Sequence, residues 1–140
     1  METKRILILE DDLLTLSTLL QKVHLFEEEL LIDNPPKDIA ITILAEYTQV
    51  EEYLNKTDHI NFDVILLDRD CKACGSFHCL DFEKYGKDKI ISISTIPQWN
   101  KEAVEKGIRK VIYKDHSQIE KFTDKVVEEI RIMLFIKQIR

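Results

Sequence analysis

Short apolar runs alternate along the chain with segments of helical periodicity, and this alternation is the feature that most restricts the fold. Each run is rich in β-branched residues and bounded by polar ones, which is typical of a strand buried in a sheet. The predicted strands cover residues 6–9, 41–45, 64–67, 89–93 and 111–113. Between them, apolar residues at helical spacing predict helices over residues 13–26, 50–54, 78–85 and 97–107.

Five strand–helix units in strict alternation predict a single α/β domain over residues 1–140, with a doubly wound parallel sheet covered by helices on both faces. The last of these helices is predicted to start at a capping box formed by Ser117 and Glu120. Open sheets of this kind bind their ligands at the carboxyl ends of the strands, where the strand order switches. The functional residues are therefore expected directly after the strands.

Composition excludes several classes of protein. The net charge is −6 and there is no basic block, so binding to nucleic acid is not expected. Three cysteines cannot form a full disulfide framework, which fits a reducing compartment. The first apolar run is too short for a signal peptide, and no apolar stretch is long enough to span a membrane. We therefore expect a cytoplasmic protein.

Charged and hydroxyl residues stand at the ends of four predicted strands. Glu10, Asp11 and Asp12 follow the first strand, and Asp68 follows the third. Ser94 and Thr95 follow the fourth strand, and Lys114 follows the fifth. With the strand order 2-1-3-4-5, the acids of the first strand adjoin Asp68, and the side chain of Lys114 can cover much of the roughly 10 Å between two strands.

This set of residues has the parts needed for transfer of a phosphoryl group. Clustered carboxylates repel one another, and Mg²⁺, which prefers oxygen ligands, relieves that repulsion. A carboxylate in such a site can attack phosphorus and form an aspartyl phosphate. The oxygens of the transferring group would be neutralised by Mg²⁺, by Lys114 and by the Ser94 hydroxyl.

The chain resembles the receiver domains of bacterial two-component response regulators. The resemblance extends over essentially the whole chain and rests on four segments, ILILEDD (6–12), FDVILLDRD (62–70), KIISIST (89–95) and VIYKD (111–115). It implies a flavodoxin-like topology and a signalling domain that is not itself an enzyme. It also implies phosphoryl transfer from a sensor histidine kinase or a phosphotransfer protein, and an output through a downstream protein partner.

The resemblance also assigns roles to individual residues. Asp68 takes the place of the phosphoacceptor, Ser94 that of the switch hydroxyl and Lys114 that of the invariant lysine. In the Mg²⁺ site, Asp11 and Asp68 would be direct ligands, Glu10 would support the water shell, and the backbone carbonyl of Asp70 would complete the set.

The chain departs from the family pattern at three positions near the site. Asp115 follows the lysine where the family usually has proline, and Val111 stands where a switch aromatic is common. Asp70 places an additional carboxylate beside the phosphoacceptor. These departures leave phosphorylation plausible and put the usual coupling to an output surface in doubt. A further hypothesis is that Asp70 repels or orients the water that hydrolyses the acyl phosphate.

Three other interpretations stay open. The first is a pseudo-receiver, in which Lys114 and Asp68 form an ion pair without phosphorylation. The second is a metal or redox module built on Cys71, Cys74, His78 and Cys79. The third is a metal-dependent phosphatase with Asp68 as nucleophile and Asp70 as proton donor, although the short loops leave little room for a substrate cap.

The last predicted helix has two apolar stripes. The first is expected to face the core and consists of Ile119, Phe122, Val126, Ile130 and Met133. The second lies roughly opposite and consists of Ile132, Phe135, Ile136 and Ile139. A helix that is apolar on both sides favours a partner, so docking or a homodimer through the face of helix four, strand five and helix five is expected. The last helix reaches Arg140, so no DNA-binding output domain is expected.

Overall fold

The computed structural model describes residues 1–56, 61–70 and 77–135. It contains a five-stranded parallel sheet with the order β2-β1-β3-β4-β5. The strands are β1 (Glu2–Leu9), β2 (Lys37–Leu44), β3 (Val64–Asp68), β4 (Ile90–Ser94) and β5 (Lys110–Tyr113). The predicted α/β class and strand order are confirmed.

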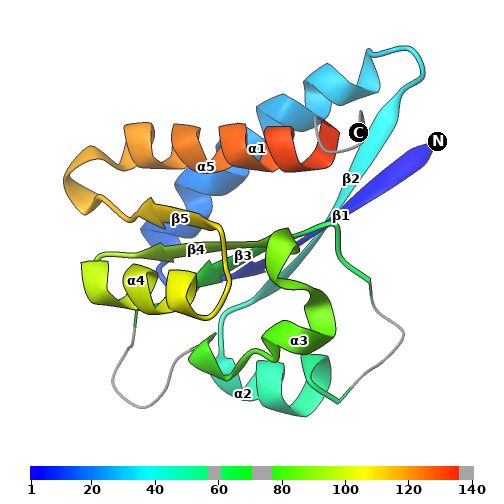
Figure 1. Ribbon diagram of the computed structural model, residues 1–140. Coiled ribbons are helices and arrows are strands. Elements are labelled where there is room, and N and C mark those ends of the chain that lie inside the picture. The colour runs from blue at the N-terminus through cyan, green and yellow to red at the C-terminus, as the bar shows by residue number, and fades with distance from the viewer. Residues whose placement is uncertain (57–60, 71–76, 136–140) are drawn as a thin grey trace.

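Helices cover both faces of this sheet. The longer helices are α1 (Leu13–Leu31), α4 (Pro97–Glu105) and α5 (Ile119–Phe135), and two short α-helices are α2 (Tyr47–Gln49) and α3 (Phe82–Tyr85). Single turns of other helix types are η1 (Val50–Leu54), η2 (Phe77–Cys79), η3 (Lys87–Lys89) and η4 (His116–Gln118). Figure 1 shows α1 and α5 side by side on one face, with α2, α3 and α4 on the other.

The alternation of side chains along the strands explains why both faces are covered. Ile6 and Ile8 of β1 belong to the core beneath α1 and α5, whereas Leu7 and Leu9 belong to the core on the opposite face. All four are fully buried. A strand that is apolar on both faces is stable only inside a sheet with two covering layers.

The bounds of the first strand differ from the prediction because polar residues at its start also pair with the neighbouring strand. The first strand begins at Glu2 rather than at residue 6, because β1 pairs with β2 along its full length. Lys4 is buried there, paired with Glu2 at 2.7 Å. The predicted helix over residues 78–85 is wrong in extent, since the chain forms the separate turns η2 and α3 in that region.

The predicted capping box at the start of the last helix is also wrong. Asp115 caps the turn η4, and its Oδ1 accepts hydrogen bonds from the Ser117 backbone N–H at 3.0 Å and from the Ser117 hydroxyl at 2.6 Å. Ser117 therefore donates to a cap and does not form one itself. An aspartate at this position can cap because its carboxylate accepts backbone N–H groups, which a proline cannot do.

The described part of the chain contains no helix that is long and apolar enough to cross a membrane.

Candidate functional site

The register of the sheet brings the predicted strand-end residues to one edge. Leu9 lies opposite Leu67, and Ser94 lies opposite Tyr113. The residues at or just past these pairs share the carboxyl edge of the sheet, and they are Glu10, Asp68, Ser94 and Lys114. The predicted convergence of these residues is confirmed by the strand pairing.

Lys114 is the cation at the centre of this edge. Its Nζ atom lies 2.7 Å from Glu10 Oε1, 3.3 Å from Asp68 Oδ2 and 3.9 Å from Asp70 Oδ2. Burial works to lower the pKa of Lys114, but Asp68 and Glu10 outweigh it and raise the pKa above its usual value. The lysine is therefore a fixed positive charge among three carboxyl groups.

Asp68 is the most perturbed acid in the site. It is fully buried at the end of β3. Burial and the neighbouring Glu10 raise its pKa far above the usual range, and Lys114 only partly opposes them. Among the described residues, Lys114 is the cation paired with this group, and Glu10 takes the nearest approach to it. Burial and Glu10 thus favour a proton on this pair of carboxyl groups.

Glu10, Asp11 and Asp68 form a cluster suited to a hard cation. One carboxylate oxygen of each residue lies within 4.8 Å of the others. Among the described His, Cys, Asp and Glu residues, these three form the cluster whose ligand atoms are close enough to hold a metal ion. Asp68 Oδ2 is buried and accepts no hydrogen bond from the described residues, although Lys114 lies nearby. Three carboxylates, one of which has a buried oxygen that accepts no hydrogen bond, suit Mg²⁺, because this ion prefers oxygen ligands.

Glu10 is held in place by the loop that it begins. Its Oε2 atom accepts hydrogen bonds from the backbone N–H groups of Asp11 at 2.9 Å and Asp12 at 3.1 Å. Its other oxygen is turned toward Lys114. Asp12 in turn caps α1, because its carboxylate accepts from the backbone N–H of Thr15 at 3.0 Å. The acidic turn thus joins the site to the first helix.

The side chain of Asp70 has a role that sequence reasoning did not predict. Its Oδ1 atom accepts a 2.6 Å hydrogen bond from the Ser94 hydroxyl and a 2.9 Å hydrogen bond from the Thr95 backbone N–H. The sequence predicted a metal-site role for the backbone carbonyl of Asp70 and, for its carboxylate, a role in hydrolysis of the acyl phosphate or as a proton donor, but no contact with Ser94. The Asp-x-Asp spacing after a buried strand was the available signal, but the contact with the Ser94 hydroxyl depends on the register of β3 against β4, in which Asp68 lies opposite Ile93.

A second group that sequence reasoning missed surrounds Arg69. This side chain is fully buried, and its Nη2 atom donates to Glu102 Oε1 of α4 at 2.8 Å. His78 Nε2 donates to the Arg69 carbonyl at 2.5 Å, and the His78 ring packs edge-on against Trp99, with 4.9 Å between ring centroids. The residue next to Asp68 is thereby tied to α4.

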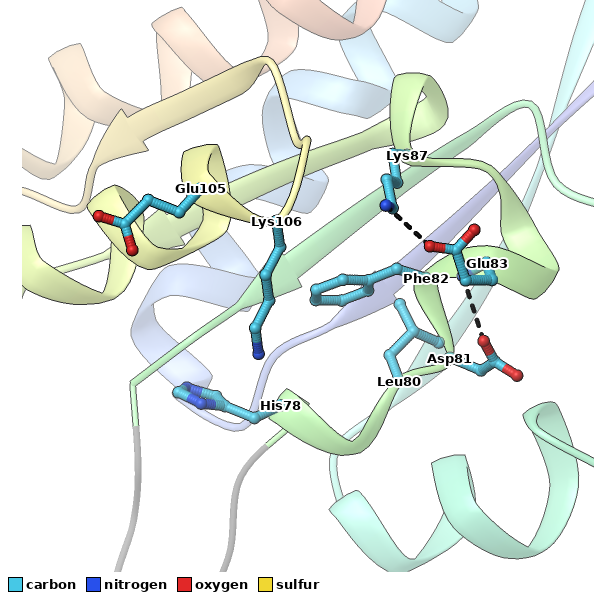
Figure 2. Close-up of a pocket in the computed structure, with 8 residues that line it drawn as sticks. All are labelled: His78, Leu80, Asp81, Phe82, Glu83, Lys87, Glu105 and Lys106. Carbon is cyan, nitrogen blue, oxygen red and sulfur yellow. Dashed lines mark hydrogen bonds and ion pairs between the residues drawn. The ribbon is translucent and has the colours of Figure 1, made fainter.

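A pocket of about 440 Å³ lies beside this group, between α3 and the end of α4. Figure 2 shows the Lys106 side chain extending toward the Phe82 ring, and Lys106 Nζ lies 5.9 Å from the ring centroid. The Glu83–Lys87 ion pair at 2.7 Å lines the same pocket. Its lining mixes both charges and includes none of the strand-end residues, so it gives no second catalytic arrangement.

The predicted cysteine site is only partly described. Cys71 and Cys74 lie outside the described residues. Cys79 Sγ donates to the Tyr47 carbonyl at 3.6 Å, and burial raises the pKa of this thiol. His78 uses its Nε2 atom on a backbone carbonyl. A zinc or redox role for this segment stays a prediction.

Comparisons with known proteins identify the fold. The structure is similar to that of the bacteriophytochrome response regulator AtBRR, with a TM-score of 0.55 at 17% identity over 81% of this chain and 84% of that chain. It is also similar to an adenylate cyclase from Rhodopirellula baltica, with a TM-score of 0.53 at 17% identity over 95% of this chain and 98% of that chain. No family model matches the sequence, and no curated protein matches it.

Proposed function

Because the chain has the fold of a response-regulator receiver domain, we propose that it accepts a phosphoryl group on Asp68 and acts in two-component signal transduction. One observation carries this proposal. A buried carboxyl group at the end of the central strand β3 lies 3.3 Å from a lysine Nζ and within 4.8 Å of two further acids. A structural ion pair does not need the additional acids, whereas phosphoryl transfer needs both a cation site and a nucleophile.

Glu10, Asp11 and Asp68 would hold Mg²⁺, together with the backbone carbonyl of Asp70. Bound Mg²⁺ supplies positive charge that favours the ionised form of Asp68 and neutralises oxygens of the transferring phosphoryl group. Without that charge, burial and Glu10 keep the pKa of Asp68 raised and the nucleophile protonated. Metal binding and nucleophile activation are therefore linked at one carboxyl group.

In the transfer step, an oxygen of the ionised Asp68 attacks the phosphorus of a phosphohistidine in a kinase or phosphotransfer protein. The new Asp68 O–P bond forms as the P–N bond breaks, and the electron pair of that bond returns to the imidazole. Lys114, already within 3.3 Å of Asp68, neutralises one phosphoryl oxygen. The Ser94 hydroxyl would donate a hydrogen bond to another oxygen.

The output surface is proposed to lie on α4, β5 and α5, where a downstream protein would bind. Three large apolar side chains are exposed on α4 and β5, namely Val104 at 52%, Val111 at 36% and Tyr113 at 57%. Asn100 joins these elements, since it accepts from the Ser92 hydroxyl at 2.9 Å and donates to the Ile112 carbonyl at 3.0 Å. A change at Ser94 can reach this face through the adjacent start of α4.

The test is a thermal unfolding experiment with Mg²⁺ and beryllium fluoride, an analogue of a phosphoryl group. We expect Mg²⁺ alone to raise the Tm, because it binds the folded state, and beryllium fluoride to raise it further only when Mg²⁺ is present. Asp11→Asn should lose most of the Mg²⁺ response, and Asp68→Asn should lose the response to beryllium fluoride.

Asp33→Asn is the matched control, because Asp33 is exposed in the turn after α1. This variant should respond as the wild type does. A wild-type protein whose Tm responds to neither Mg²⁺ nor beryllium fluoride would overturn the proposal in favour of a pseudo-receiver that acts through protein contacts alone.

A further inference from the structure

The Asp70 carboxylate makes three contacts at the edge of the sheet. Ser94 donates its hydroxyl hydrogen to Asp70 Oδ1 at 2.6 Å. The Thr95 backbone N–H lies 2.9 Å from Oδ1 and 3.2 Å from Oδ2. Lys114 Nζ lies 3.9 Å from Oδ2. A hydroxyl, a backbone N–H and an ammonium group thus converge on one anionic side chain.

These contacts use the hydrogen-bonding capacity of the turn between β4 and α4. A serine hydroxyl has one hydrogen to donate, and that of Ser94 is directed to Asp70. The Ser94 oxygen also accepts from the Ile96 backbone N–H at 2.9 Å. A second anion at the end of β3 can obtain the Ser94 and Thr95 hydrogens only if Asp70 releases them.

A phosphoryl group on Asp68 is such an anion. The oxygens of a phosphoryl group need hydrogen-bond donors and positive charge. At the end of β4 the donors are the Ser94 hydroxyl and the Thr95 backbone N–H, and both donate to Asp70. We propose that the Asp70 carboxylate acts as an internal anion in the unphosphorylated chain. It accepts the Ser94 and Thr95 hydrogen bonds that the oxygens of a phosphoryl group on Asp68 would otherwise accept. This inference rests on the proposed function of Asp68.

Two consequences follow from this arrangement. First, the turn over residues 94–97 is already held by an anion, so phosphorylation exchanges one anion for another at Ser94 and Thr95. Second, the incoming phosphoryl group must displace Asp70, which slows phosphorylation. Loss of the carboxylate would therefore loosen the turn before phosphorylation and speed the reaction.

The first experiment is amide hydrogen exchange measured by NMR on the unphosphorylated protein. In Asp70→Ala, the Thr95 amide should exchange at least about tenfold faster than in the wild type, because a hydrogen bond to a charged group is lost. Asp70→Asn keeps the shape of the side chain and loses its charge, so its exchange rate should fall between the two.

Asp81→Ala is the matched control, because Asp81 is also an aspartate whose Oδ1 accepts two hydrogen bonds, in its case from the backbone N–H groups of Glu83 at 3.1 Å and Lys84 at 3.2 Å in α3. It should leave Thr95 exchange unchanged. Unchanged exchange at Thr95 in Asp70→Ala would overturn the proposal, and so would an Asp70→Asn rate equal to that of the wild type, since charge would then play no part.

The second experiment compares rates of phosphorylation by acetyl phosphate with Mg²⁺. Asp70→Ala should react roughly tenfold faster than the wild type, the factor expected from removing a competing charged hydrogen bond. An equal or slower rate would overturn the inference. If neither protein takes up a phosphoryl group, the proposed function of Asp68 fails, while the exchange experiment, which needs no phosphoryl donor, still decides whether Asp70 holds the turn.

Discussion

Asp68 is a buried acid whose proposed function comes at the expense of stability. It is buried beside Glu10, and its ion-pair partner among the described residues, Lys114, lies closer to Glu10 than to Asp68. Its raised pKa means that the folded state binds a proton that the unfolded chain releases at neutral pH. Stability therefore falls as pH rises from the ordinary value of 3.8 toward the raised pKa.

We predict that Asp68→Asn stabilises the protein at pH 8, by at least about 1 kcal/mol, because an amide has no charge to desolvate. The measurement is urea denaturation at pH 5 and at pH 8. Both pH values lie between the ordinary pKa of 3.8 and the raised pKa of Asp68, where the free energy of unfolding of the wild type should change with pH. The gain over the wild type should grow with pH. A variant less stable than the wild type across this range would contradict the account of Asp68.

Most site residues could be predicted because they directly follow buried strands. Asp68 ends the buried strand β3 and Lys114 follows the edge strand β5, and parallel pairing brings them to one edge. The contacts of the Asp70 side chain could not be predicted, because they depend on the register in which β3 pairs with β4. The burial of Arg69 was also missed, since a charged residue is buried only where a partner such as Glu102 is available.

At the scale of elements, the first helix depends on a cap that belongs to the acidic turn. The Asp12 carboxylate accepts from the backbone N–H and from the hydroxyl of Thr15, and the Thr15 hydroxyl hydrogen bond lowers the pKa of Asp12 despite partial burial. This stabilisation is present above the ordinary pKa of 3.8 and is lost as pH falls through the lowered value.

We predict that Asp12→Ala lowers the free energy of unfolding by about 1 kcal/mol at pH 7, with a smaller loss in strong acid, where the wild-type cap is protonated. Asp12→Asn should recover most of the loss, because its side-chain oxygen can still accept. Chemical denaturation of the three proteins gives the test. Equal stability of Asp12→Ala and the wild type at pH 7 would refute the capping role.

The second apolar stripe of the last helix is partly explained by packing within the domain. The Phe135 ring lies edge-on to Phe26 of α1, with 6.0 Å between ring centroids, and Arg131 stacks over Phe26. The sequence indicated self-association or docking through this stripe, with packing inside the domain as the alternative, because periodicity shows that a residue is apolar but not which neighbour covers it. Ile136 and Ile139 of the same stripe lie outside the described residues.

Truncation of Phe26 tests this packing. Phe26→Ala should cost about 3–5 kcal/mol of stability, because it leaves a cavity between α1 and α5. Leu25→Ala, one position earlier and 60% exposed, is the matched control and should change stability by less than about 0.5 kcal/mol. Similar losses in the two variants, measured by denaturation, would contradict the proposed contact between the helices.

At the scale of the whole molecule, the candidate site and the proposed output face are joined by polar side chains. Arg69 follows Asp68 and reaches Glu102 of α4. Asn100 of the same helix links β4 to β5. The fold itself was predictable from strand–helix alternation, whereas these links were not, because periodicity does not show which polar side chain of one element reaches another.

The expected homodimer would use this face. We predict that beryllium fluoride with Mg²⁺ shifts the protein toward a dimer in sedimentation velocity experiments, and that Val104→Glu prevents the shift by placing a charge among the exposed apolar residues of α4 and β5. Leu25→Glu, on the exposed side of α1, should behave as the wild type does. A protein that stays monomeric at high concentration in both states would exclude the dimer and leave a different protein as the partner.

The central claim is that Asp68 accepts a phosphoryl group. Intact-protein mass spectrometry after incubation with acetyl phosphate tests it most directly. The account predicts that the wild type gains the mass of one phosphoryl group when Mg²⁺ is present, that chelation of Mg²⁺ prevents the gain, and that Asp68→Asn shows none. No added mass on the wild type, or the same added mass on Asp68→Asn, would contradict it.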